Sequence, residues 1–103
     1  MTLEKTTYMN SLYDSYGELL TPRQRAVFES HYQEDFSLSE IAENIVATKQ
    51  AVSQLLKTAE KQLTTFETHL HLVENQAARN ELMQTLLSKY PTDTTLKDLA
   101  NLL

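Results

Sequence analysis

The stretch SLSEIAENIVATKQAVSQLL, residues 37–56, predicts two helices joined by a tight turn, and the rest of the fold can be worked out around it. Ser37 is a favoured N-cap residue and Glu40 follows three positions later, which is the pattern of a capping box. Thr48 offers a second cap soon after the first helix ends, so we expect the next helix to begin at Lys49. Two helices joined by so short a turn predict a helix-turn-helix.

The segment before this stretch predicts two more helices. In LTPRQRAVFESHY, residues 20–32, Thr21 suits an N-cap, Pro22 suits the first helical position, and Gln24 completes a second capping box. We therefore expect a helix from Pro22 to about Tyr32. Upstream of it, apolar residues recur at three- and four-residue spacing, which predicts an amphipathic helix over residues 3–20.

The segment after the turn carries apolar residues whose spacing alternates between four and three from Val52 to Ala77. This is the pattern of a heptad seam and predicts one long, unbroken helix. Up to Ala59 the seam serves the domain core, but beyond it the seam needs another partner. That partner is either the first and last helices of the same chain or a second copy of the chain. We favour a homodimer, and the residues expected in either dimer or helix packing are Leu63, Phe66, Leu70 and Val73.

The C-terminal part is helical as well. AARNELMQTLLSKY predicts a helix that ends near Tyr90, Pro91 breaks it, and Thr92 or Asp93 caps a last short helix. The whole chain is thus predicted to be all-α, with five or six helices in a single domain at residues 1–103. Its helix-turn-helix core is expected at residues 20–63, and a C-terminal helical extension at residues 64–103.

Composition agrees with this fold class and bounds the function. One glycine and two prolines among 103 residues are too few for a β-rich fold, and the lack of cysteine excludes disulfides and thiolate metal sites. The polar N-terminus lacks the apolar stretch of a signal peptide, and no run reaches the roughly 18 apolar residues of a membrane span. We therefore expect a cytoplasmic protein that does not enter the membrane.

The net charge of −5 argues against generic nucleic-acid binding, which depends on lysine and arginine displacing counterions. Five of the nine basic residues lie at positions 21–63, so this segment is the least acidic part of the chain. Any DNA binding must therefore come from a local face of the protein and not from its overall charge.

Two strings of the sequence, LTPRQRAVFESHYQEDFSLSEIAE and TKQAVSQLLKTAEKQL, resemble region 4 of bacterial sigma factors. Together with LEKTTYMNSLYDSY and ETHLHLVEN they are similar to the YlxM-like family of small proteins from Gram-positive bacteria, over about residues 3–75. The resemblance implies a helix-turn-helix with a long recognition helix and a regulatory role through double-stranded DNA. It also implies a connection to the signal recognition particle, a component of which would then be a partner.

The sequence departs from these families at several positions. Thr48 and Lys49 stand where the family has serine and arginine, and Ser53 stands where it has tyrosine. Lys49 keeps a charge but lacks the bidentate fork of arginine. Val46 occupies the turn position where sigma factors carry glycine. Because a β-branched residue disfavours a left-handed backbone, we expect an altered turn there.

The candidate DNA-binding residues follow from the helical geometry. The second helix of a helix-turn-helix enters the major groove, where Gln50 can pair with an adenine and Lys49 with a guanine or a phosphate. Further hydroxyl and basic groups can contact phosphates. The alternative for every one of them is an ordinary solvated helix face. The full candidate set is Thr48, Lys49, Gln50, Ser53, Gln54, Lys57, Ser37, Ser39, Arg23 and Arg25.

No catalytic pattern is present in the sequence, so we expect neither an enzyme nor a cofactor. His69 and His71 are two positions apart on a helix and point in different directions, whereas helical metal ligands are spaced by about four, so no metal site is expected. The alternative to a DNA-binding regulator is an interaction module of the secretion machinery that binds protein or RNA. The acidic net charge favours that alternative.

Overall fold

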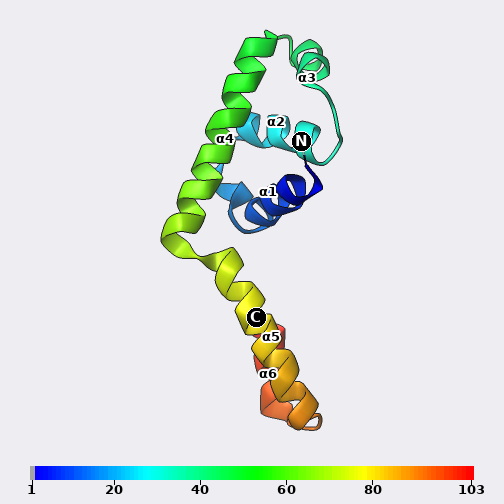
Figure 1. Ribbon diagram of the computed structural model, residues 1–103, viewed down its shortest axis with the longest axis vertical. Coiled ribbons are helices and arrows are strands. Elements are labelled where there is room, and N and C mark those ends of the chain that lie inside the picture. The colour runs from blue at the N-terminus through cyan, green and yellow to red at the C-terminus, as the bar shows by residue number, and fades with distance from the viewer. Residues whose placement is uncertain (1) are drawn as a thin grey trace. The chain divides into compact units, whose positions relative to one another are not determined.

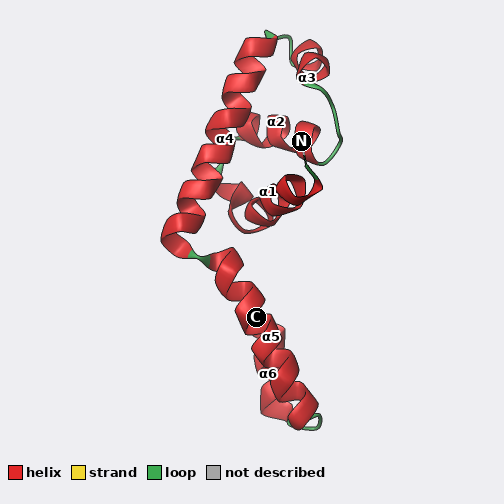
Figure 2. Cartoon of the chain, in the orientation of Figure 1, coloured by secondary structure: helices red, strands yellow, loops and turns green. Residues whose placement is uncertain are grey.

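The structure, a computed structural model, describes residues 2–103, which form α-helices and one short 3₁₀-helix (Figure 1; Figure 2). No strand occurs among these residues, which confirms the prediction of an all-α fold. In chain order the elements are α1 (Leu3–Tyr16), η1 (Gly17–Leu19), α2 (Pro22–Tyr32), α3 (Leu38–Asn44), α4 (Lys49–Leu70), α5 (Leu72–Lys89) and α6 (Thr94–Leu102).

The helices begin where the capping residues predict. The side chain of Thr21 accepts a hydrogen bond from the backbone N–H of Gln24 at 3.2 Å, and Gln24 Oε1 accepts one from the N–H of Thr21 at 2.9 Å. Ser37 and Glu40 form the same reciprocal pair, with both bonds at 3.1 Å. These bonds satisfy N–H groups that have no partner within a helix, and they therefore place the starts of α2 and α3.

The chain divides into two compact units, and the first of them ends at Leu70. In this unit α1, α2 and α3 each pack against α4, as Figure 1 shows for the blue, cyan and green segments. The contacts bury one apolar side chain from nearly every turn of the four helices. The buried apolar side chains are Met9, Leu12, Tyr16, Leu20, Val27, Phe28, Tyr32, Ile41, Ala42, Val52, Leu56, Ala59 and Leu63.

Three tyrosine–glutamate hydrogen bonds join the helices of this unit in pairs. Tyr13 Oη of α1 donates to Glu29 of α2, and Tyr16 Oη of α1 donates to Glu67 Oε1 of α4 at 2.6 Å. Tyr32 Oη of α2 donates to Glu60 Oε1 of α4 at 2.7 Å. The bonds connect α1 with α2, α1 with α4 and α2 with α4, and a bond to an ionised acceptor is stronger than one between neutral groups.

The turn between α3 and α4 has a left-handed residue at Val46, whose φ is 54°. The prediction of an altered turn without a left-handed residue was therefore wrong. The N–H of Ala47 donates to the carbonyl of Ala42 at 2.9 Å, and the N–H of Val46 donates to that of Glu43 at 3.4 Å. These are the two bonds of a Schellman motif, which needs a left-handed residue at this position. The packing of α3 on α4 thus overrides the local preference of valine.

Another left-handed residue, His71 with a φ of 54°, separates α4 from α5. The prediction of one unbroken helix through the heptad seam was therefore wrong. Leu63 is fully buried in the first unit, whereas Leu70, the last residue of α4, is 51% exposed. The apolar residues of the seam therefore do not all pack on one continuous surface. Histidine is one of the residues that tolerates the left-handed region.

The second unit, His71–Leu103, is a hairpin of α5 and α6. It therefore begins at His71 and not at residue 64, where the C-terminal extension was expected. Pro91 lies between the helices, and Asp93 caps α6 by accepting the N–H of Leu96 at 3.1 Å, as predicted. Met83 is the buried residue of this unit, while many of its leucines stay exposed.

None of the helices in residues 2–103 combines the length and the apolar character that a membrane crossing requires.

The tyrosine–glutamate bonds predict a loss of stability in alkali. Burial, followed by the bond to Glu29, raises the pKa of Tyr13 to about 12, and burial with the bond to Glu60 also raises the pKa of Tyr32. An unfolded tyrosine has a pKa of about 10, so the stabilisation is complete below pH 10 and is lost as the pH rises towards the folded values. We expect the free energy of unfolding, measured by urea denaturation, to fall between about pH 10 and pH 12.

A Tyr32→Phe variant separates this effect from the titration of lysines. It should be less stable than the wild type at pH 8 by about 1–2 kcal/mol, because one charge-assisted hydrogen bond is missing. Its further loss above pH 10 should be smaller than that of the wild type. Parallel losses in the two proteins would contradict the assignment to Tyr32.

The turn predicts a stabilising substitution at Val46. A non-glycine residue in the left-handed region costs about 1–2 kcal/mol, and the Val46 side chain, 93% exposed, contributes little packing. Val46→Gly should therefore raise the free energy of unfolding by up to about 1 kcal/mol, after the greater flexibility of unfolded glycine is subtracted. Ala47→Gly is the matched control, since Ala47 has no positive φ and should only be destabilised. A loss of stability in Val46→Gly would contradict the proposed strain.

Candidate nucleic-acid interface

The outward face of α4 is held in place by the opposite flank of the same helix. Val52, Leu56 and Ala59 are at most 6% exposed, and they pack towards the preceding helices. One helix cannot bury both flanks on the same neighbours, so Lys49 and Gln50 are left exposed. Of the remaining predicted residues of α4, Gln54 and Lys57 are exposed as expected, whereas Ser53 is half-buried.

The acidic and the basic side chains of α4 have different surroundings in the fold. Both glutamates of the helix accept hydrogen bonds from tyrosines of the first unit, Glu60 from Tyr32 and Glu67 from Tyr16. The three lysines of the helix, Lys49, Lys57 and Lys61, are all exposed. No carboxylate lies within ion-pair distance of any of these lysines in the part of the chain that the structure describes. An acidic protein thus presents one locally basic helix face.

The hydroxyl residues predicted to contact phosphate lie at helix N-termini. Thr48 Oγ1 accepts the backbone N–H of Ala51 at 3.0 Å and so caps α4. Ser37 caps α3, and Ser39 is exposed in the first turn of that helix. The bond from Ser37 N–H lowers the pKa of Glu40, so this carboxylate stays charged close to Ser37 and Ser39. Of these hydroxyls, only Thr48 lies next to the basic face of α4.

The two arginines of α2 differ in exposure and in their neighbours. Arg23 is exposed. Arg25 is half-buried and lines a small hollow of about 220 Å³ together with Tyr13, Asp14 and Glu18. Arg25 was predicted to be among the basic groups that can contact phosphates. Its helical position instead turns it towards the acidic side chains of α1 and η1.

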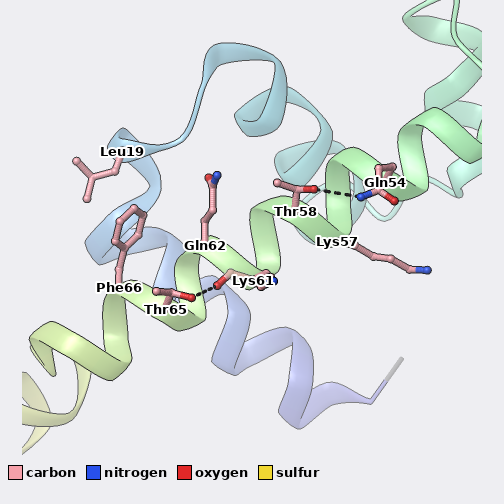
Figure 3. Close-up of a pocket in the computed structure, with 8 residues that line it drawn as sticks. All are labelled: Leu19, Gln54, Lys57, Thr58, Lys61, Gln62, Thr65 and Phe66. Carbon is pink, nitrogen blue, oxygen red and sulfur yellow. Dashed lines mark hydrogen bonds between the residues drawn. The ribbon is translucent and has the colours of Figure 1, made fainter.

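A groove runs along the second half of α4 (Figure 3). The sequence alone did not predict it. It has a volume of about 660 Å³, and it continues from the predicted residues Gln54 and Lys57. In Figure 3 Leu19 and Phe66 lie at one end, and Lys57 extends away from them. The other lining residues are Thr58, Lys61, Gln62 and Thr65. The four-residue spacing of Lys57 and Lys61 was a visible signal, but the approach of Leu19 depends on tertiary structure.

The predicted dimer residues do not share one accessible surface. Leu63 is fully buried inside the first unit, so it takes part in helix packing, the other of the two expected alternatives, and cannot contact a second copy. Phe66 is half-buried, with its ring centroid 5.9 Å from that of Tyr16. Leu70 is 51% exposed at the end of the first unit. Val73 is half-buried and belongs to the second unit.

The histidines form no metal-ligand group. His69 and His71 are exposed, and His71 Nδ1 lies 3.2 Å from Glu74 Oε2. His31 Nδ1 lies 3.1 Å from the backbone carbonyl of Phe36. Across residues 2–103 no three histidine, aspartate or glutamate side chains are grouped closely enough to hold a metal ion.

The chain is similar to a known family over nearly its whole length. Residues 3–102 match the family UPF0122, described as "Putative helix-turn-helix protein, YlxM / p13 like". A UPF0122 protein of Lactococcus lactis subsp. cremoris (strain MG1363) is 44% identical over 96 residues, which cover 93% of this chain and 86% of the relative. One from Streptococcus equi subsp. zooepidemicus is 40% identical over 103 residues, covering 100% and 91%. One from Streptococcus pyogenes serotype M5 is 37% identical, with the same coverage.

Proposed function

Because this chain belongs to the UPF0122 family of YlxM / p13-like proteins, we propose that it is a cytoplasmic regulatory protein that binds double-stranded DNA through the outward face of α4. The observation that carries the proposal is the separation of charge on this helix. Its lysines are exposed while both of its glutamates are bonded to tyrosines of the core. A local basic face is what an acidic protein needs to bind a polyanion.

The roles of the individual residues follow from their positions on α4. The N-terminal turn of a recognition helix reaches base edges, so Gln50 is assigned to an adenine and Lys49 to a guanine or a phosphate. Thr48 lies at the helix N-terminus, where backbone N–H groups favour an anion, and it is assigned to phosphate. Lys57, two turns further along, is assigned to the DNA backbone. Arg25 is not assigned a phosphate contact, because it lines a hollow with the carboxylates of Asp14 in α1 and Glu18 in η1.

The direct test is a double substitution of exposed lysines. We expect the purified protein to bind duplex DNA at low salt, and Lys49→Ala with Lys57→Ala to weaken binding about tenfold or more, measured by fluorescence anisotropy. Both side chains are exposed, so the circular dichroism of the variant should be unchanged. Lys89→Ala with Lys97→Ala, which changes the net charge equally in the second unit, is the control.

Two results of this experiment would count against the proposal. Equal affinity of the wild type and the Lys49/Lys57 variant would reject the assigned residues. A wild type that binds no duplex of any sequence would reject the class of function.

A second candidate is an interaction module of the secretion machinery, in which a signal recognition particle component, protein or RNA, takes the place of DNA. The net charge of −5 supports it, as does the lysine at position 49 where the resembling families have arginine. Pull-down from a cell extract with and without nuclease distinguishes the two candidates. Partners that are lost on nuclease treatment point to nucleic acid, and partners that remain point to a protein complex.

We also propose that the protein is a homodimer, with the second unit as the contact in place of the buried Leu63. A hairpin of two helices buries little apolar surface by itself, and this one leaves leucines exposed on both helices. On α5, Leu82 is 66% and Leu86 38% exposed, four residues apart on one face, and Tyr90 follows at 56%. Such a face is stabilised when a second copy covers it.

Light scattering at high micromolar concentration tests the dimer. The wild type should have twice the chain mass of 11.8 kDa, and Leu82→Gln with Leu86→Gln should reduce it to the chain mass. Leu3→Gln, at a leucine that is 79% exposed on α1, should leave the mass unchanged. A wild type that scatters as a monomer would rule out the dimer.

A further inference from the structure

Three lysines from two different helices meet beside the second half of α4. Lys5 of α1 and Lys57 and Lys61 of α4 line one groove of about 420 Å³, together with Met9, Glu60, Thr64 and Thr65. Lys57 and Lys61 also line the larger groove described above, so the two hollows adjoin along these side chains. All three lysines are exposed.

The single carboxylate of this groove, that of Glu60, does not cancel its charge. Glu60 Oε1 accepts the hydrogen bond of Tyr32, and Glu60 Oε2 lies 3.9 Å from Lys5 Nζ. Three ammonium groups therefore face one carboxylate that is already bonded on one oxygen. Neither Lys57 nor Lys61 has an acidic partner within ion-pair distance in residues 2–103. In a chain with a net charge of −5, this is a locally positive surface with room for an anion.

The position of the cluster along α4 relates it to the DNA-binding face. With a rise of 1.5 Å per residue, Lys61 lies about 18 Å from Lys49, which exceeds the roughly 12 Å width of a major groove. A helix that crosses the groove, with its first turns inside, therefore leaves the groove before Lys61. At that point it passes the sugar–phosphate backbone that borders the groove.

We propose that Lys5, Lys57 and Lys61 form a clamp for the phosphodiester backbone that flanks the bound site. This inference rests on the proposed function and extends the contact surface from α4 to α1. Lys57 and Lys61 are one turn apart, about 6 Å along the helix, and successive phosphates of one strand are spaced 3.4 Å along the duplex axis. Their flexible stems can therefore reach neighbouring phosphates, and Lys5 approaches from the side of α1.

The measurement that reports phosphate contacts is the salt dependence of affinity. Each lysine–phosphate contact contributes about 0.9 to the slope of log K against log salt. Lys5→Gln with Lys61→Gln should reduce the slope by about 2, with little effect on which sequence is preferred. Between 50 and 200 mM salt, the variant should thus lose about 12-fold less affinity than the wild type.

Two controls make the result specific. Lys89→Gln with Lys97→Gln removes the same charge from the second unit and should leave the slope unchanged. The salt dependence is measured with duplex DNA and with duplex RNA of the same sequence, because both contain the phosphodiester group. The clamp is tested by the slope of log K against log salt on whichever duplex the protein binds. A reduced slope on DNA alone assigns the clamp to DNA, and one on RNA assigns it to RNA.

The outcomes separate this inference from the function on which it rests. A wild type that binds neither duplex overturns both. Binding by the wild type with an unchanged slope in the Lys5/Lys61 variant overturns the clamp alone. An equal reduction in the Lys89/Lys97 control also overturns it, since net charge and not the clamp would then set the slope.

Discussion

The structure of the first unit depends on the burial of one flank of α4. Val52, Leu56, Ala59 and Leu63 lie on successive turns of that flank, and none of them is more than 6% exposed. They contact three helices that precede α4 in the chain, so one element organises the whole unit. Burial at about 25 cal/mol per Å² of apolar surface is the main favourable contribution to such packing. Its geometric consequence is as important, because it decides which flank of α4 faces solvent.

The tyrosine–glutamate bonds add a second constraint, which is electrostatic. Glu60 and Glu67 accept hydrogen bonds from Tyr32 and Tyr16, and the lysines of α4 stay exposed without a carboxylate within ion-pair distance in residues 2–103. The protein is acidic overall, yet the helix that would enter a nucleic acid presents its positive charges outward. A tyrosine hydroxyl is well suited to this position, because its ring packs in the core while its oxygen reaches a carboxylate at the edge.

The starts of the helices could be predicted because they depend on local chemistry. Thr21, Ser37 and Asp93 accept the hydrogen bonds that the capping patterns indicate, within a few residues of sequence. The turn at Val46 and the break at His71 could not be predicted in this way. At Val46 the left-handed conformation belongs to the hydrogen-bonded turn between α3 and α4 and runs against the preference of valine, and at His71 it lies where the two compact units divide. The heptad spacing was misleading because spacing alone does not show that Leu63 belongs to the core of the first unit.

The sequence by itself determined the helical class, the positions of the caps, the helix-turn-helix and the amphipathic character of α4, because each of these depends on residues close together in the chain. The exposed residues of α4 followed from that periodicity. Only the tertiary structure decided that Arg25 faces carboxylates, that Leu63 is unavailable to a partner, and that Lys5 joins Lys57 and Lys61. These outcomes depend on how separate helices meet, and spacing along one helix carries no information about the neighbour that its side chains will contact.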